Sequence, residues 1–77
     1  MMSPKLPRIT ASELLRALRR DGWQRARQSG SHIMLKHPKK TGYVIVPMHM
    51  SVTLKPKTLA TILKQADLTV DDLQELL

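Results

Sequence analysis

The sequence contains no cysteine and no phenylalanine, and its only Trp and Tyr residues are Trp23 and Tyr43. Without cysteine the chain has no disulfides, no thiolate ligands for zinc and no cysteine nucleophile. Small secreted domains usually need disulfides, so we expect a protein of the reducing cytoplasm. With so few aromatic residues, the core must be built from Leu, Ile, Val, Met and Ala.

Long hydrophobic runs are also missing. The first ten residues, MMSPKLPRIT, lack the apolar stretch of a signal peptide, and no run approaches the roughly 20 apolar residues of a membrane span. We therefore expect a soluble, intracellular protein with no segment inserted in a membrane. A chain of 77 residues is long enough for one domain with a thin core.

Acidic residues are scarce and unevenly placed. Thirteen Lys and Arg face six Asp and Glu, and four of these acids lie in the last eleven residues, which contain no Lys or Arg. Residues 1–66 therefore carry thirteen basic and two acidic side chains, a balance of +11. Such a charge indicates a polyanionic partner, either nucleic acid, an acidic protein or an anionic membrane, although positive charge can also serve solubility alone.

The first segment is predicted to be an arm followed by a helix. Residues 1–9, with two prolines, are expected to form a flexible N-terminal arm. Thr10 and Glu13 fit a capping box, and Leu14 and Leu18 share an apolar stripe at helical spacing. Gly22 supplies a left-handed stop, so we predict a helix over residues 11–20.

Three strands are predicted next, over residues 23–28, 31–36 and 43–47. Ser29-Gly30 is a turn signal between the first two strands, and the segment HPKKTG, with Pro38 and Gly42, is a loop. The run YVIVP is rich in β-forming residues and ends at a proline, which cannot donate to a β-ladder.

The last third of the chain is predicted to be helical. Pro56 is suited to a helix start, and Leu59, Ile62, Leu63 and Ala66 follow at amphipathic spacing. Thr69 can cap a short final helix. The chain is thus predicted to form one α+β domain over residues 10–77, with helices on one face of a three-stranded antiparallel sheet.

Alternation along the second strand separates its side chains into two sets. Ile33 and Leu35 suit the face that the helices cover, whereas His32, Met34 and Lys36 would then lie on the open face. A one-residue slip would reverse this assignment.

Standard catalytic motifs are missing from the sequence. It has no phosphate-binding glycine loop, no HExxH and no paired carboxylates before the tail, so the candidate groups are His32, His37 and His49. His37 precedes a proline and suits an ordinary loop residue, and His49 suits either a structural hydrogen-bonding role or a functional one. Three histidines without a neighbouring carboxylate are a poor metal-ligand set in a positive field, so we expect neither a metal nor another cofactor.

A histidine among positive charges is suited to RNA cleavage. The reaction needs a base for the ribose 2′-OH, an acid for the leaving 5′-oxygen and cations for the charge that builds on phosphate. Imidazole can serve either proton-transfer step near neutral pH, and lysine and arginine can supply the cations.

Four segments, in this order, resemble the HicA toxin family, also called YcfA-like. They are DGW at 21–23, GSH at 30–32, VPMH at 46–49 and LKPKTLATILKQADL at 54–68. The resemblance covers nearly the whole chain after the arm. The sequence departs from the family pattern at Lys57 and Asp67, where family members commonly have glycine. Because Asp tolerates the left-handed conformation, Asp67 affects only the geometry of the helix end.

The resemblance implies a fold similar to the double-stranded-RNA-binding domain, α-β-β-β-α, with a short C-terminal helix. It also implies an mRNA interferase, an endoribonuclease that is the toxin of a type II toxin–antitoxin pair. Because the sequence lacks a metal-ligand set, we expect this activity to be metal-independent. The family's catalytic histidine corresponds to His32 and its PxH histidine to His49, for which we expect a supporting role. Lys36 would lie on the same open face as His32, so we expect it to support catalysis as well. The expected partners are mRNA and an acidic HicB-like antitoxin.

Candidate RNA contacts cluster around the predicted hairpin and the loop after it. They are Arg25, Arg27, Lys36, Lys39 and Lys40. An alternative is a non-catalytic module for double-stranded RNA, which would bridge phosphates with a loop and with lysines near a helix start, such as Lys55 and Lys57. The acidic tail would either be a solvated helix or take part in partner recognition.

Overall fold

A computed structural model describes residues 5–47 and 51–77 of the chain. The elements are, in order, α1 (Ala11–Asp21), β1 (Gln24–Ser29), β2 (His32–Lys36), β3 (Tyr43–Pro47), α2 (Pro56–Ala66) and α3 (Val70–Leu76). This order confirms the predicted α+β layout with a short C-terminal helix. Three elements differ from the prediction by one residue: α1 continues to Asp21, both ends of β1 are shifted one residue forward, and β2 begins at His32.

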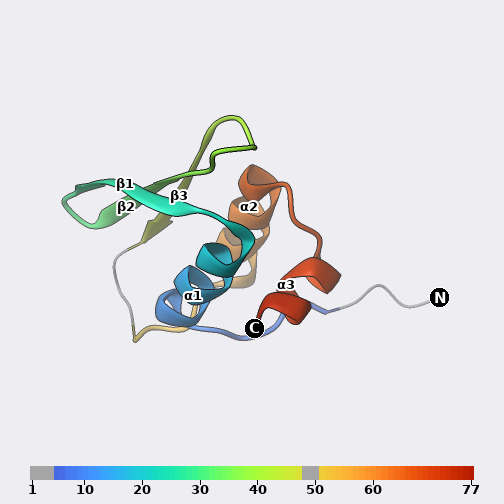
Figure 1. Cartoon of the computed structure of the whole chain (residues 1–77). Helices are drawn as coiled ribbons and strands as arrows, with labels where there is room; N and C mark the ends of the chain where they lie inside the picture. Colours follow the sequence, from blue (N-terminus) through green and yellow to red (C-terminus); the bar gives the residue numbers. More distant parts are fainter. Residues whose placement is uncertain (1–4, 48–50) are drawn as a thin grey trace.

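The three strands form an antiparallel sheet in the order β1-β2-β3, and the helices lie together on one side of it (Figure 1). In the register between β2 and β3, His32 pairs with Pro47, Met34 with Ile45, and Lys36 with Tyr43. Directly opposed residues in an antiparallel pair project from the same face. These three pairs therefore share the face that points away from the helices.

The core lies between the helices and the inner face of the sheet. Its strand residues are Ile33, Leu35, Val44 and Val46, all nearly or fully buried. Its helical residues come from all three helices and are Ala11, Leu14, Ala17, Leu18, Leu59, Ile62, Leu63, Ala66 and Leu73. The assignment of Ile33 and Leu35 to the helix-covered face is thus confirmed, and His32 and Lys36 are exposed on the other face.

The strand β1 buries none of its six residues. It is held by pairing with β2, and its register shifts between Arg25 and Arg27, where Ala26 forms a bulge. Because a bulge places one extra residue on one strand, the side chains before and after it do not follow a single alternation.

The predicted capping box begins α1. The Thr10 hydroxyl accepts a hydrogen bond from the Glu13 backbone N–H, and the Glu13 carboxylate accepts one from the Thr10 backbone N–H at 3.0 Å. Hydrogen bonds from the backbone and then the side chain of Thr10 hold the pKa of Glu13 below its ordinary value. A second capping box, between Thr69 and Asp72, begins α3 and lowers the pKa of Asp72 in the same way.

The helix α2 begins at Pro56, as predicted, and no side chain caps its N-terminus. It ends at Ala66 and is capped by Asp67, which adopts the left-handed conformation with φ 56° and donates its N–H to the carbonyls of both Leu63 and Lys64. Asp67 therefore makes the left-handed turn that glycine most often makes at helix ends.

Basic side chains from other elements bind the last carbonyl of each helix. His37 contacts the Asp21 carbonyl of α1, Lys40 donates to the Ala66 carbonyl of α2, and Arg20 donates to the Leu76 carbonyl of α3. Helix C-termini leave their final carbonyls without partners and carry partial negative charge, so basic donors are favourable there.

His37 lies in the loop after β2, as predicted, but it is a buried structural residue rather than an ordinary loop residue. Its Nδ1 accepts the backbone N–H groups of Lys39 at 3.0 Å and Lys40 at 3.2 Å. A ring nitrogen that accepts carries no proton, so Nε2 bears the hydrogen and donates to the Asp21 carbonyl at 2.7 Å. The ring also meets Trp23 edge-on, with centroids 5.1 Å apart.

Both ends of the described chain pack on the core. Ile9 is buried and Leu6 is half-buried, so the segment expected to be a flexible arm contributes to the core within residues 5–9. The acidic helix α3 buries Leu73 and exposes its carboxylates, which is the predicted arrangement of a solvated helix.

In the part of the chain that the structure describes, the helices are too short or too polar to span a bilayer.

The first prediction concerns a substitution at Gly22. The φ of Gly22 is +109°, and a Cβ placed on it would lie 2.7 Å from His37 Nε2. The imidazole cannot easily move, because three backbone groups bind its two nitrogens. We expect Gly22→Ala to lower the free energy of unfolding by about 2–3 kcal/mol, measured by urea denaturation.

Gly42→Ala is the matched control. Gly42 also has a positive φ, +79°, but a Cβ on it would contact nothing within 4 Å. We expect Gly42→Ala to lower the free energy of unfolding by only about 1–2 kcal/mol, the cost of placing a residue other than glycine in the left-handed conformation. Equal losses in the two variants would mean that His37 does not require a glycine beside it.

Candidate functional site

The candidate site is built on the open face of the sheet around His32. Because Ile33 and Leu35 are buried, the pleat of β2 directs His32 outward at the start of the strand. Its ring is exposed, and Ser31 Oγ lies 3.4 Å from Nδ1. Within residues 5–47 and 51–77, no carboxylate contacts this ring, so the imidazole is open to an incoming ligand.

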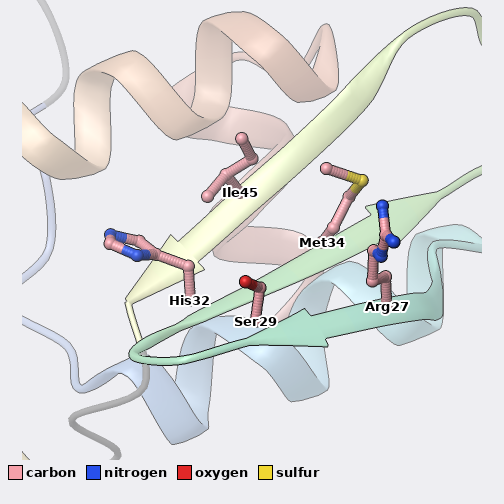
Figure 2. Close-up of a pocket in the computed structure, with 5 residues that line it drawn as sticks. All are labelled: Arg27, Ser29, His32, Met34 and Ile45. Atoms are coloured by element: carbon pink, nitrogen blue, oxygen red, sulfur yellow. The ribbon is translucent and has the colours of Figure 1, made fainter.

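A hollow of about 360 Å³ lies on the β1 side of His32 and is lined by all three strands. Its lining residues are Arg27, Ser29, His32, Met34 and Ile45. Figure 2 shows these five side chains on the same side of the sheet, with Arg27 and His32 at opposite ends. The register explains the grouping, since Ser29 is paired with His32, and Arg27 with Met34.

A second hollow, of about 550 Å³, lies between His32 and the start of α2. Its sheet residues are His32, Ile45 and Pro47, and its α2 side includes Lys55, Lys57, Thr58, Thr61 and Gln65. Gln65 fixes this wall to the sheet, because its side-chain oxygen accepts the Ile45 N–H at 3.2 Å. His32 thus stands between an arginine on one side and two lysines on the other.

The predicted RNA contacts fall into separate groups. Arg27 lies with His32, whereas Arg25 and Lys36 line a different depression with Gln24, Ala26, His37 and Pro38. Lys36 is four residues from His32 along β2, which corresponds to about 13 Å at ~3.3 Å per residue. Lys39 is exposed in the loop, and the predicted supporting residue His49 lies outside the described residues.

Lys40 is already engaged by the protein. Its Nζ lies 2.8 Å from Asp21 Oδ2 and donates to the Ala66 carbonyl at 2.9 Å. These contacts tie the β2–β3 loop to the ends of α1 and α2. Lys40 is therefore less available to a ligand than Arg27 or Lys39.

Several lining residues were not identified as site residues from the sequence. The run YVIVP contains the signal for Ile45, because burial of Val44 and Val46 requires Tyr43, Ile45 and Pro47 to face outward. On the α2 side, Lys55 and Lys57 were predicted only as phosphate contacts of the alternative RNA-binding module, and the rest of that wall had no signal in the sequence. The wall comes near His32 through packing of α2 beside β3.

The fold and this site define a small α+β protein with an exposed histidine set among basic side chains on an open sheet. The family model described as the HicA toxin of bacterial toxin–antitoxin matches residues 11–68, which is most of the chain. The chain belongs to the HicA toxin family of bacterial toxin–antitoxin systems. It is accordingly a toxin of such a system, and a cognate antitoxin is implied as its partner. A comparison with curated proteins found no match.

The engagement of Lys40 gives the second prediction. Lys40→Met removes one partly buried ion pair and the donor to the Ala66 carbonyl. We expect the free energy of unfolding to fall by about 1–2 kcal/mol. Lys39→Met, at an exposed neighbouring position, is the control and should change it by less than about 0.5 kcal/mol. Equal stabilities in the two variants would show that the Lys40 contacts contribute little and that this side chain is free to bind ligand.

Proposed function

We propose that this toxin is a metal-independent endoribonuclease, an mRNA interferase, in which His32 transfers a proton during cleavage. The observation that carries the proposal is the exposure of His32 between Arg27 and the two lysines at the start of α2. The membership of a toxin family supports the same conclusion. RNA is the substrate that this combination of imidazole and cations suits.

The chemistry needs few groups. His32 takes the proton of the ribose 2′-OH, which then attacks the adjacent phosphorus, or it donates a proton to the leaving 5′-oxygen. Arg27, Lys55 and Lys57 stabilise the negative charge that develops on the phosphate. Because these side chains supply both acid–base and electrostatic catalysis, the reaction is expected to proceed without a metal ion.

The antitoxin is proposed to be an acidic, HicB-like protein that covers the same face. All six Asp and Glu of the chain lie in α1 or after the end of α2, so none is in the sheet or within α2. The face around His32 is therefore positive, and an acidic protein would approach it rapidly and exclude RNA.

The third prediction concerns His32→Ala. We expect it to slow cleavage of an RNA oligonucleotide by about 10²–10⁴-fold, the usual contribution of general acid–base catalysis. The assay uses purified protein in EDTA, and the wild type should leave 2′,3′-cyclic phosphate or 3′-phosphate ends.

The variant needs a control for folding, and an unchanged circular dichroism spectrum and unfolding midpoint supply it. A folded His32→Ala protein that cleaves at the wild-type rate would refute the role of His32. A wild-type protein that binds double-stranded RNA and cleaves no RNA would instead identify a binding module. Activity lost in EDTA and restored by magnesium would refute the metal-independent reaction.

The fourth prediction concerns the electrostatics of RNA binding. If Arg27 binds a phosphate, Arg27→Ala should flatten the slope of log affinity against log salt by about 0.7 for a single strand. Arg16→Ala makes the same charge change on α1, at an exposed position outside the sheet, and should leave the slope unchanged. Equal changes in slope would show that Arg27 contributes only to the net charge.

A further inference from the structure

The hollow between Arg27 and His32 has an apolar floor. Met34 and Ile45 form the centre of its lining, and its volume of about 360 Å³ lies in the range of small-molecule sites, roughly 300–1,000 Å³. Phosphate contacts require no such surface. Such a floor is suited to a small apolar group beside His32.

The two floor residues lie at one of the closer pairs of the β2–β3 ladder. The Ile45 N–H points away from β2, toward Gln65, so Met34 and Ile45 form a non-hydrogen-bonded pair. In such pairs the Cα atoms are about 4.5 Å apart and the side chains are closer than in hydrogen-bonded pairs. The result is a continuous apolar surface that spans two strands.

The apolar surface extends along β3 and is open to solvent. Ile45 is 41% exposed and Tyr43, two residues before it on the same face, is 53% exposed. Tyr43 is the only exposed aromatic residue of the described chain and presents a ring on which a planar group can stack. The surface thus runs from His32 over Met34 and Ile45 to Tyr43.

The charges around this surface identify the occupant. His32 lies at one end of the surface, and Lys36 lies opposite Tyr43 at the other. Arg27 lies opposite Met34, and Lys55 and Lys57 lie beyond Ile45. No carboxylate lies in the three strands or within α2. An apolar, planar group on an anionic backbone fits such a surface, and a nucleotide has this composition. A purely apolar peptide would leave the cations without partners.

The distance to His32 is suited to a neighbouring nucleotide. Met34 is two residues from His32 along β2, about 6.6 Å at ~3.3 Å per residue. A base on Met34 and Ile45 would therefore place its own sugar and phosphate next to the imidazole. Bases of a double helix are stacked and paired inside it, so only an unpaired base can enter the hollow.

We propose that the open face of the sheet is a base-binding subsite for single-stranded RNA, in which the base adjacent to the scissile phosphate packs on Met34 and Ile45, and the next one stacks on Tyr43. This inference rests on the proposed function and specifies its substrate class as unpaired RNA. It assigns the sheet surface, rather than the loops and helix ends, to recognition of bases.

The test measures binding in the His32→Ala background, so that RNA stays intact. The probes are a fluorescent single-stranded RNA oligonucleotide, the same oligonucleotide with one base removed at successive positions, and the corresponding duplex. The test variant combines Met34→Gln with Ile45→Thr, which keeps the length of the first side chain, shortens the second by one carbon, and makes both polar. Val52→Thr is the matched control, because Val52 is 58% exposed and lies outside the sheet and the hollows.

We expect the test variant to bind the single strand about 5- to 10-fold more weakly, the lower part of the range for loss of one stacked base. Its salt slope should be unchanged, because no cation is removed. Removal of one particular base should weaken binding by the His32→Ala protein to a similar extent and should have no further effect on the test variant. Val52→Thr should bind as the His32→Ala protein does.

Tighter binding of the duplex than of the single strand, or equal sensitivity of both proteins to base removal, would overturn the inference. The inference would also be overturned if the test variant bound RNA normally but no longer bound the antitoxin. The apolar surface would then be a contact surface for the protein partner. The proposed function fails differently. Single-stranded RNA that is bound in the expected manner but never cut by the wild type would refute cleavage and leave the base subsite standing.

Discussion

The position of His32 depends on one constraint, the burial of Ile33 and Leu35 against the helices. Both side chains are less than 5% exposed, and full burial of such a side chain is worth about 1.5–3 kcal/mol. A one-residue slip of β2 would expose both and would turn His32 and Lys36 into the core. The register is therefore held by the core, and the exposed histidine follows from the pleat.

The two ends of the β2–β3 pair have different surroundings. At one end, His37 and Lys40 bind the last carbonyls of α1 and α2 and thereby fix the loop to the helices. At the other end, His32 faces Pro47, and the hydrogen bond to the outer edge of β3 that the described residues provide comes from Gln65. Pro47 is tolerated there because, two residues after Ile45, its nitrogen also points to the outer edge, where no ladder hydrogen bond is lost.

Most of the fold could be predicted because its signals are local. The capping box of Thr10 and Glu13, the stop at Gly22 and the start at Pro56 each depend on residues within a turn of one another. The face of His32 also follows from alternation within one strand. β1 was placed one residue early because QRARQS contains no buried residue, so its bounds are set by pairing with β2 rather than by its own pattern.

The candidate site could be predicted only in part, because its other groups meet through tertiary contacts. The loop lysine Lys40 binds Ala66, 26 residues away, and nothing local distinguishes it from the exposed Lys39. The buried role of His37 likewise depends on Asp21, 16 residues earlier. The hollow beside His32 needs the register that joins β1 to β2 and β2 to β3, which the sequence pattern does not specify.

The separation of charge across the molecule constrains how an antitoxin can inhibit this toxin. Acidic residues lie on α1 and beyond α2, whereas His32, Arg27, Lys55 and Lys57 lie around the open sheet. A chain of 77 residues with a net charge of +7 has a thin core with which to offset repulsion among these cations. An acidic antitoxin over the sheet would both relieve that repulsion and occupy the apolar surface of Ile45. Because the charge and the apolar surface lie on one face, RNA and such an antitoxin would have to compete for it.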